Sequence, residues 1–291
     1  MSGEWNPQSN DEVLRPSRVR QLLAPLRERR FTYAAYDAFL GRLRSDPRVL
    51  VVPLREFRSE GEVVVGLRHD VDDRLDSALV LAELEHRRGI RSTYFVLHTA
   101  PYWESPDLIP SLQRLQALGH EVGFHNDLVT LERVHGVDAG AFLRSGLARL
   151  RAAGIDVDGV AAHGSIWCHR RGFHNNYAFV GWDELVDGFP SRDGLPKLDP
   201  ADFGLVYEAY HLGEDAYSSD STFDRGGRRW HPELFDPARL ARGDRAIVLV
   251  HPCHWDASVA AKAARVALRA ATKLGGRQSE LGAAPPQARS S

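Results

Sequence analysis

From Glu62 onward, short runs rich in β-branched residues alternate with stretches whose apolar residues recur at helical spacing. This alternation is typical of βα units, whose strands form a parallel sheet with helices packed against it. The predicted strands cover residues 63–69, 92–97, 121–125, 159–163, 204–210 and 246–251. The sequence therefore predicts an α/β fold.

The helix predicted over 75–88 has the clearest pattern, because Leu75, Ala78, Leu79 and Ala82 recur at helical spacing. We expect further helices over 31–46, 107–118, 139–153 and 257–273, and an additional strand over 48–57. The sequence has no internal repeat and no long linker. We therefore expect a single domain over 21–274, with residues 31–57 as a lead-in layer, between a flexible segment at 1–20 and a disordered tail at 275–291.

Composition excludes several classes of function. Lys and Arg number 37 against 39 Asp and Glu, so the net charge of −2 provides no general basic field for nucleic acid. Apolar runs are too short for a membrane span, and residues 1–20 lack the apolar core of a signal peptide. We expect a cytoplasmic protein that binds neither nucleic acid nor membranes. The sequence leaves its oligomeric state open.

Polar residues follow four of the predicted strands: RHDVDD, FHND, HGS and the single residue His251. The carboxyl ends of the strands in a βα barrel meet at one mouth, so these groups are predicted to lie close together. Because side chains alternate along a strand, Asp70 and Asp72 share one side and His69 takes the other. Gly123, His125 and Asp127 share a side if their strand stays extended.

Paired carboxylates in such a mouth point to a metal ion. Two carboxylates cannot both stay ionised in a dry site without a cation. One Asp and two His from different strands would form a ligand set that suits zinc, and also iron, cobalt or nickel. The alternative is structural, because Asp72 or Asp73 could cap the following helix.

The segments RHDVDD, GHEVGFHND, SSDS at 218–221 and LVHP together resemble the motifs of the polysaccharide deacetylase superfamily, which includes carbohydrate esterase family four. The resemblance covers about residues 60–256. It implies a deformed (β/α)7 barrel that binds a divalent metal ion and hydrolyses N-acetyl groups of sugars. By position it implies Asp70 as general base, Asp72 and His125 as metal ligands, His251 as general acid, and Asp220 in a block that orients a catalytic partner.

This chain departs from the superfamily pattern at one metal ligand. The metal-binding histidines of the superfamily are four residues apart, whereas Val129 stands four residues after His125. We expect His163, at the end of the next strand, to replace the missing ligand, with Asp127 as the alternative. The opening motif is also unusual, because HDVD replaces the common TFDDG.

These features predict a metal-dependent hydrolase of an amide C–N bond that deacetylates a sugar or a sugar-containing biosynthetic intermediate. Two alternatives are a metal-independent hydrolase of a ureide or cyclic amide and a non-catalytic carbohydrate-binding protein. We interpret 168–177 as a substrate loop; Cys168, His169 and His174 as soft-metal ligands, and an ordinary surface loop, are the alternatives. The basic segment 224–232 could bind a phosphate or carboxylate, or be a solvated turn.

Overall fold

The computed structural model describes residues 31–186, 188–189, 194–222, 230–265 and 267–268. The segments predicted to be flexible at 1–20 and disordered at 275–291 lie outside the described residues. Residues 224–229 of the basic segment also lie outside them. Of the helix predicted over 257–273, residues 259–265 and 267–268 are helical, and residues 266 and 269–273 lie outside the described residues.

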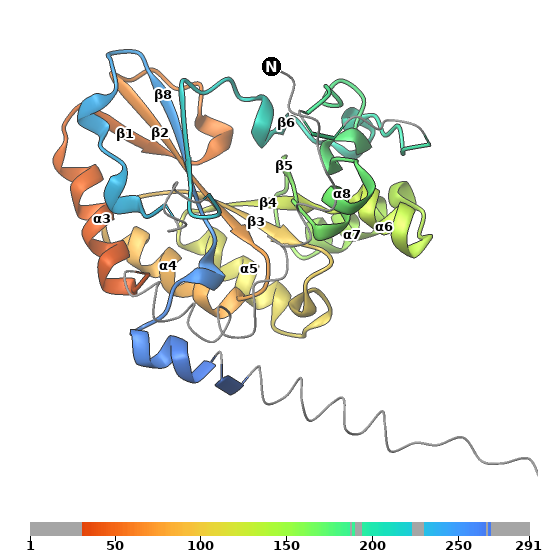
Figure 1. Ribbon diagram of the computed structural model, residues 1–291, viewed down its shortest axis with the longest axis horizontal. Helices are drawn as coiled ribbons and strands as arrows, with labels where there is room; N and C mark the ends of the chain where they lie inside the picture. Colours follow the sequence, from red (N-terminus) through yellow and green to blue (C-terminus); the bar gives the residue numbers. More distant parts are fainter. Residues whose placement is uncertain (1–30, 187, 190–193, 223–229, 266, 269–291) are drawn as a thin grey trace, which may run out of the picture.

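One sheet of parallel strands organises the molecule (Figure 1). The strand order is β6-β5-β4-β3-β2-β8-β7. The remaining strand, β1, pairs with the first half of β2, and β3 pairs with the second half of β2 along the same edge. Within the described residues, β6 and β7 are the two ends of this order, so the curled sheet stays open between them. The seven strands of this order, without β1, confirm the expected deformed (β/α)7 barrel. The strands are β1 (Val49–Val52), β2 (Val63–Val71), β3 (Thr93–Leu97), β4 (Glu121–Asn126), β5 (Gly159–Ala162), β6 (Tyr207–Glu208), β7 (Ala216–Ser219) and β8 (Arg245–Val250).

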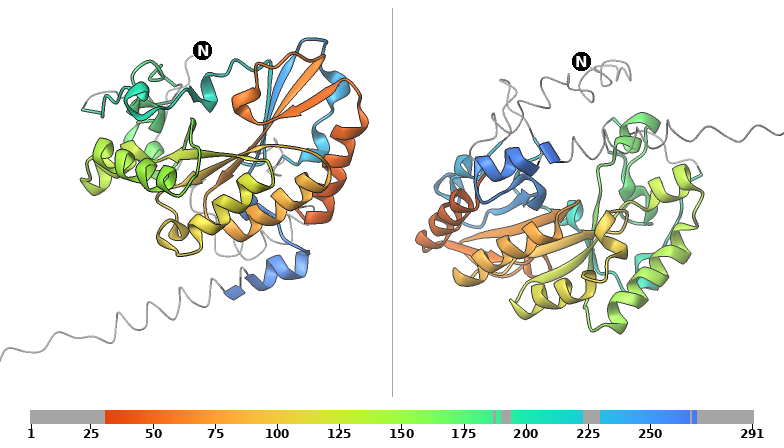
Figure 2. Two further views of the ribbon diagram at one scale, coloured as in Figure 1. Left: turned by 180° about the vertical axis from the view of Figure 1, so that it is seen from behind. Right: turned by 90° about the horizontal axis from the view of Figure 1, so that it is seen from below.

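The longer helices lie along the outer side of the curled sheet, as two further views make clear (Figure 2). They are α3 (Tyr33–Ser45), α4 (Leu75–Arg87), α5 (Leu108–Ala117), α6 (Leu128–His135), α7 (Ala139–Ala152) and α8 (Ile166–Arg171). Short 3₁₀ segments complete the connections: η1 (Leu54–Glu56), η2 (Pro101–Glu104), η3 (Asn175–Ala178), η4 (Pro200–Phe203), η5 (Ala209–His211), η6 (Pro232–Leu234), η7 (Pro237–Arg239) and η8 (Pro252–His254). None of the helices in the described ranges has the length and apolarity that crossing a bilayer requires.

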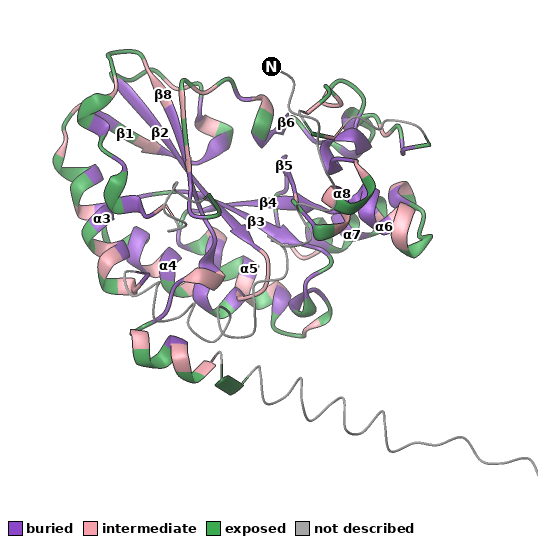
Figure 3. Cartoon of the chain, in the orientation of Figure 1, coloured by how far each residue is buried: buried purple, intermediate pink, exposed green. Residues whose placement is uncertain are grey.

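The strands are buried along most of their length, whereas the helices bury one side only (Figure 3). Along β2, Val63, Val65 and Leu67 pack outward against α3 and α4, and Val64 packs inward. The period of two therefore separates an outer core from a smaller apolar cluster inside the barrel. Residues at the carboxyl end of β2 that share the parity of Val64 face the inside as well.

Most sequence-predicted elements are present, with five differences in the described residues. β7 and the helices α6 and α8 were not predicted, and β6 covers only two residues of the strand predicted over 204–210. The strand predicted over 48–57 ends at Val52, because Pro53 lacks the N–H of a ladder donor and η1 follows it.

Candidate active site

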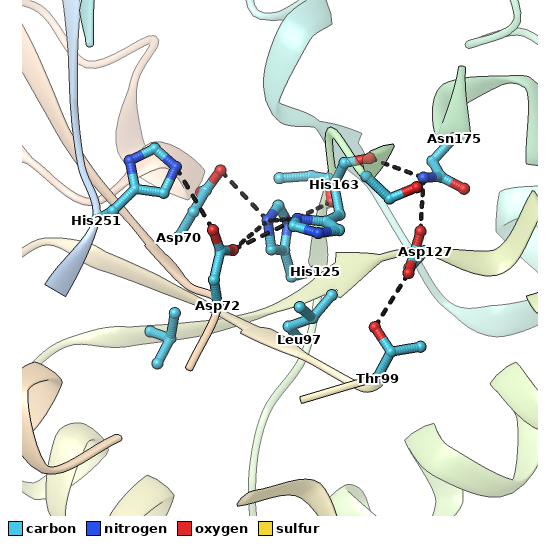
Figure 4. Close-up of polar contacts among 12 residues, drawn as sticks. Asp70, Asp72, Leu97, Thr99, His125, Asp127, His163, Asn175 and His251 are labelled. Carbon is cyan, nitrogen blue, oxygen red and sulfur yellow. Dashed lines mark hydrogen bonds and ion pairs between the residues drawn. The ribbon is translucent and has the colours of Figure 1, made fainter. Parts of the chain in front are cut away.

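Strand parity brings the predicted site residues to one inner surface at the carboxyl ends of the strands. Asp70 and Asp72 come from β2, and His125 comes from β4. His163 follows β5 and His251 follows β8. All five side chains line one cavity of about 220 Å³, and the close-up shows them turned toward one another (Figure 4).

Three of these side chains present ligand atoms at nearly equal separations. Asp72 Oδ1 lies 3.3 Å from His125 Nε2 and 3.4 Å from His163 Nδ1. The two ring nitrogens lie 3.3 Å apart. Ligands held at about 2.0–2.1 Å from a tetrahedral ion are themselves about 3.3–3.4 Å apart. The three atoms therefore fit one tetrahedral metal ion.

Two further contacts agree with a metal site. His125 Nδ1 lies 2.9 Å from the Ala161 carbonyl oxygen, which can only accept, so this nitrogen carries a proton and Nε2 is the nitrogen that faces Asp72 and His163. Metal-binding histidines commonly donate their other N–H in this way. In addition, Asp72 Oδ1 is buried without a hydrogen-bond partner. A buried carboxylate oxygen of this kind is a ready metal ligand.

The electrostatics of the three groups are strongly coupled. Burial raises the pKa of the Asp72 carboxyl, but the imidazoles of His125 and His163 outweigh that effect and hold it well below its usual value. Burial lowers the pKa of His163, yet the Asp72 carboxylate raises it on balance. Asp72 is therefore ionised at neutral pH, the state that metal binding requires.

Asp70 is held by a charged partner from its own strand. Arg68, two residues earlier and on the same face, donates from Nε to Asp70 Oδ1 and from Nη2 to Oδ2, both at 2.8 Å. Burial raises the pKa of Asp70, but the Arg68 guanidinium and then His125 lower it overall. Asp70 consequently stays ionised and can accept a proton in the cavity.

His251 is paired with Asp220, which follows β7. The ring nitrogen Nδ1 lies 2.5 Å from Asp220 Oδ1, and the backbone N–H of His251 also donates to this carboxylate. Burial lowers the pKa of His251, but Asp220 raises it to about 9. The second ring nitrogen, Nε2, lies 4.0 Å from Asp72 Oδ2. His251 is thus protonated at neutral pH with one nitrogen toward the cavity.

The alternative ligand Asp127 lies outside this set. The chain leaves the extended conformation at Asp127, with φ −119° and ψ 32°, so the side chain no longer follows the strand alternation. Its carboxylate instead accepts from Thr99 Oγ1 at 3.1 Å and Asn175 Nδ2 at 2.9 Å (Figure 4). As for the structural alternative, α4 begins at Leu75 with Arg74 as its N-cap, and the Asp72 carboxylate lies against His125 and His163.

The stretch 168–177 differs from the predicted substrate loop. Its residues Asn175, Asn176 and Tyr177 are buried and pack against the barrel. Cys168 is also buried, which raises the pKa of its thiol, and in the described residues it belongs to no metal-ligating group. Only Arg170 and Arg171 remain exposed, and both guanidinium groups lie over the ring of Trp167.

Sequence reasoning missed several residues that line the cavity or bind one of its side chains. Arg68 had a readable signal, because it shares strand parity with Asp70 and Asp72. Tyr210 and Tyr217 line the cavity from η5 and β7, each about 40% exposed. His254 had no distinguishing signal; its Nδ1 lies 3.0 Å from Asp220 Oδ2.

No family model and no curated protein matches the sequence. Among solved structures, a family 4 carbohydrate esterase from Streptomyces lividans in complex with acetate is 17% identical, with a TM-score of 0.34, over 72% of this chain and 88% of that chain. A CE4 family pseudoenzyme from Bacillus anthracis is 15% identical, with a TM-score of 0.34, over 73% and 60%. A mutant of it with restored enzymatic activity has 15% identity and a TM-score of 0.33, over 72% and 63%.

This chain spans less than two thirds of the length of the two pseudoenzyme structures. TM-scores this low do not establish a shared fold. The fold assignment therefore depends on the strand order, and the chemistry depends on the side chains in the cavity.

Proposed function

We propose that this protein is a metal-dependent hydrolase of an amide C–N bond, and that it removes an N-acetyl group from a sugar or a sugar-containing biosynthetic intermediate. One observation carries the proposal: the ligand atoms of Asp72, His125 and His163 have the mutual separations of a tetrahedral site. The same cavity holds an ionised carboxylate, Asp70, and a protonated imidazole, His251.

In this proposal Asp72, His125 and His163 hold the ion, which we assign as zinc, with cobalt, nickel and iron as alternatives for the same ligand set. A divalent ion bound there would polarise the substrate carbonyl and lower the pKa of a water molecule toward about 7. The remaining steps belong to the side chains around it.

Asp70 is the general base in this scheme. It accepts one proton from the attacking water, whose oxygen forms a bond to the carbonyl carbon. His251 is the general acid, and its Nε2 donates a proton to the amide nitrogen as the C–N bond breaks. The products are a carboxylic acid and an amine. Asp220 keeps the Nδ1 proton of His251 in place and stabilises the imidazolium form.

Two features support a sugar as the substrate. The sequence motifs resemble those of sugar deacetylases. Moreover, Tyr210 and Tyr217 offer aromatic surface at the cavity, beside polar groups from Asp70 and His254. A sugar ring presents both an apolar face and hydroxyl groups, so this mixed lining matches it.

The test combines metal analysis with an amine-release assay. Purified protein is stripped with a chelator and assayed on N-acetylated monosaccharides and nucleotide-linked sugars, before and after zinc is returned. We expect activity to disappear with the metal and to return with it. Amide hydrolysis that survives complete metal removal would refute the proposal and favour a metal-independent ureide or cyclic amide hydrolase.

A further inference from the structure

The side chain of Asn175 binds three neighbouring parts of the chain beside the candidate metal site: the residue after β4, the segment after β5 and the start of α6. Asn175 opens η3 and is fully buried. Its Oδ1 accepts from the backbone N–H groups of Val129 and Thr130, at 3.1 and 3.2 Å, in the first turn of α6. Its Nδ2 donates to the carbonyl oxygen of His163 at 2.7 Å and to Asp127 at 2.9 Å (Figure 4).

These four contacts, two at each end, match the two donors and two acceptor positions of a side-chain amide. Two weaker contacts of Nδ2 accompany them, to Cys168 Sγ at 3.3 Å and Thr130 Oγ1 at 3.5 Å. Both groups at the oxygen are N–H donors, and the two closest groups at the nitrogen are oxygen acceptors. The amide therefore has one satisfactory orientation. A buried group that is satisfied at every position holds its neighbours in a single arrangement.

The backbone of His163 is fixed on both sides by this arrangement. Its N–H donates to the Asn126 carbonyl at 2.7 Å, and its carbonyl accepts from Asn175. The atom that faces Asp72 and His125 is Nδ1. In the imidazole ring, Nδ1 is bonded to the carbon that carries Cβ, so its position follows the backbone closely. A displaced His163 backbone would therefore displace the ligand atom.

We propose that Asn175 is a positioning residue for the metal site: it anchors the segment after β5 to the start of α6 so that His163 Nδ1 completes the set with Asp72 and His125. The inference rests on the proposed function, because it takes His163 as a ligand. The position to which Asn175 binds on α6 is also the position of the missing ligand. Asn175 binds the backbone of Val129, which stands four residues after His125 and offers no ligand atom itself.

The test is the affinity for zinc alone, measured by competition with a chromophoric chelator. Asn175→Ala is expected to bind zinc about 10–100-fold more weakly, the usual loss when the group that orients a ligand is removed. The cobalt-substituted variant is expected to show an altered d–d absorption spectrum, because the His163 nitrogen no longer completes a tetrahedral set. Asn175→Asp keeps an acceptor for α6 but loses both donors, and it is expected to weaken zinc binding as well.

A double-mutant cycle separates positioning from a general structural role. In a His163→Ala background, Asn175→Ala is expected to change zinc affinity by less than twofold, because the ligand through which it acts is already absent. The matched control is Thr99→Val, which removes the other hydrogen bond to Asp127 and leaves His163 untouched. It is expected to bind zinc like the wild type.

The outcomes are distinguishable. If the wild type binds zinc and folded Asn175→Ala or Asn175→Asp binds it equally tightly, the positioning role is overturned and the proposed function stands. Equal losses from Asn175→Ala with and without His163 would also overturn the role, because the loss would then be structural. Should Asn175→Ala fail to fold, Asn175→Asp decides. A wild type without zinc affinity would refute the metal-dependent function and this inference together.

Discussion

Arg68, Asp70 and Asp72 place three charges in succession on the inner face of one strand. Burying charges carries a large desolvation cost, which is offset only by close, well-oriented partners. Arg68 and Asp70 meet this condition through two parallel hydrogen bonds. Asp72 faces two imidazoles instead. The pattern R-x-D-x-D therefore combines an ion pair, Arg68 with Asp70, and a second carboxylate, Asp72, that can bind a metal ion together with the two imidazoles.

Asp70→Asn tests the base directly. We expect turnover to fall by about 10²–10⁴-fold, since an amide cannot accept the water proton. Zinc content should persist, because Asp72 and the two imidazoles are unchanged. The variant also leaves Arg68 without a carboxylate, which is expected to cost about 3–5 kcal/mol of stability. Activity, zinc content and urea unfolding are therefore measured on the same preparation. Asp73→Asn, outside the cavity lining, is the control, and a fully active Asp70→Asn would refute the assignment.

Asp72→Asn and His125→Ala are expected to differ from Asp70→Asn in their zinc content. Asp72→Asn replaces the charged ligand oxygen with a neutral amide, and His125→Ala removes a ligand nitrogen. Both variants are therefore expected to lose bound zinc as well as activity. Elemental analysis after dialysis checks this result. Either variant with a full zinc content would contradict the assigned ligand set. Together with Asp70→Asn, these variants separate metal binding from proton transfer.

Asp220→Asn tests the support of the acid. The carboxylate holds the Nδ1 proton of His251 and raises its pKa to about 9. Without it the imidazole loses its fixed orientation, and we expect kcat to fall about 10²–10⁴-fold with zinc content unchanged. Steady-state kinetics with metal analysis make the measurement. An unchanged kcat would show that His251 does not need this partner.

At the level of single residues, alternation along strands correctly predicted which side chains of β2 face the cavity. It placed Asp70 and Asp72 on one side and His69 on the other, where His69 contacts Glu85 of α4 at 2.6 Å. Alternation failed for Asp127, since it holds only while the strand stays extended. The partners of Asn175 could not be predicted at all, because they come from elements up to 49 residues away in the chain.

At the level of elements, the sequence predicted the buried central strands well and the edges poorly. β2, β3, β4, β5 and β8 are buried along nearly all of their length, as expected for strands covered on both faces. Among the strands that the structure describes, β7 pairs with β8 alone, and its residues Ala216–Ser219 are mostly small or polar. β6 is two residues long. Edge strands depend on pairing more than on their own hydrophobicity, so periodicity does not reveal them.

Gly123 of β4 shows how closely the barrel interior is packed. It shares the inner face with His125, and an added Cβ would overlap the ring of Phe95 on β3. Gly123→Ala is therefore expected to lower the free energy of unfolding by about 1–3 kcal/mol through overpacking. Urea denaturation measures it. Gly164→Ala is the matched control, because a Cβ there meets no atom within 4 Å. Equal stability of the two variants would contradict this packing.

At the scale of the whole molecule, the apolar cores and the polar site are separated by the sheet. Two large apolar clusters lie between the strands and the outer helices. A third, smaller cluster fills the inside of the barrel around Val64, Phe95 and Ile247. The charged residues of the candidate site lie toward the carboxyl ends of the strands, beyond this cluster. Stability therefore comes mainly from the outer layers, which leaves the inner surface near the mouth available for chemistry.

One histidine links that stability to pH. His98 follows β3, is almost fully buried, and stacks on Phe124 with ring centroids 5.0 Å apart. Its Nε2 accepts the backbone N–H of Asp127 at 3.0 Å, so the folded protein needs this nitrogen unprotonated. Burial, and then the nearby charges of His125 and His163, lower the pKa of His98 to about 3.

The sign of the effect follows from linkage. The unfolded chain binds a proton at His98 with a pKa of about 6.5, so it gains protons before the folded protein does. The contribution of His98 is complete above that pH and is lost as the pH falls toward 3. Between pH 8 and pH 5, this group alone is expected to lower the free energy of unfolding by about 2 kcal/mol.

His98→Gln isolates the contribution, because its side-chain oxygen can accept the Asp127 N–H and does not titrate in this range. Urea unfolding of both proteins at pH 8 and pH 5 gives the comparison. The loss of stability between the two pH values is expected to be about 2 kcal/mol smaller in the variant than in the wild type. Equal losses would mean that the buried His98 is not the group that couples acid to unfolding. The other buried histidines, such as His174 with its pKa lowered by burial to about 4, would then be the next groups to replace.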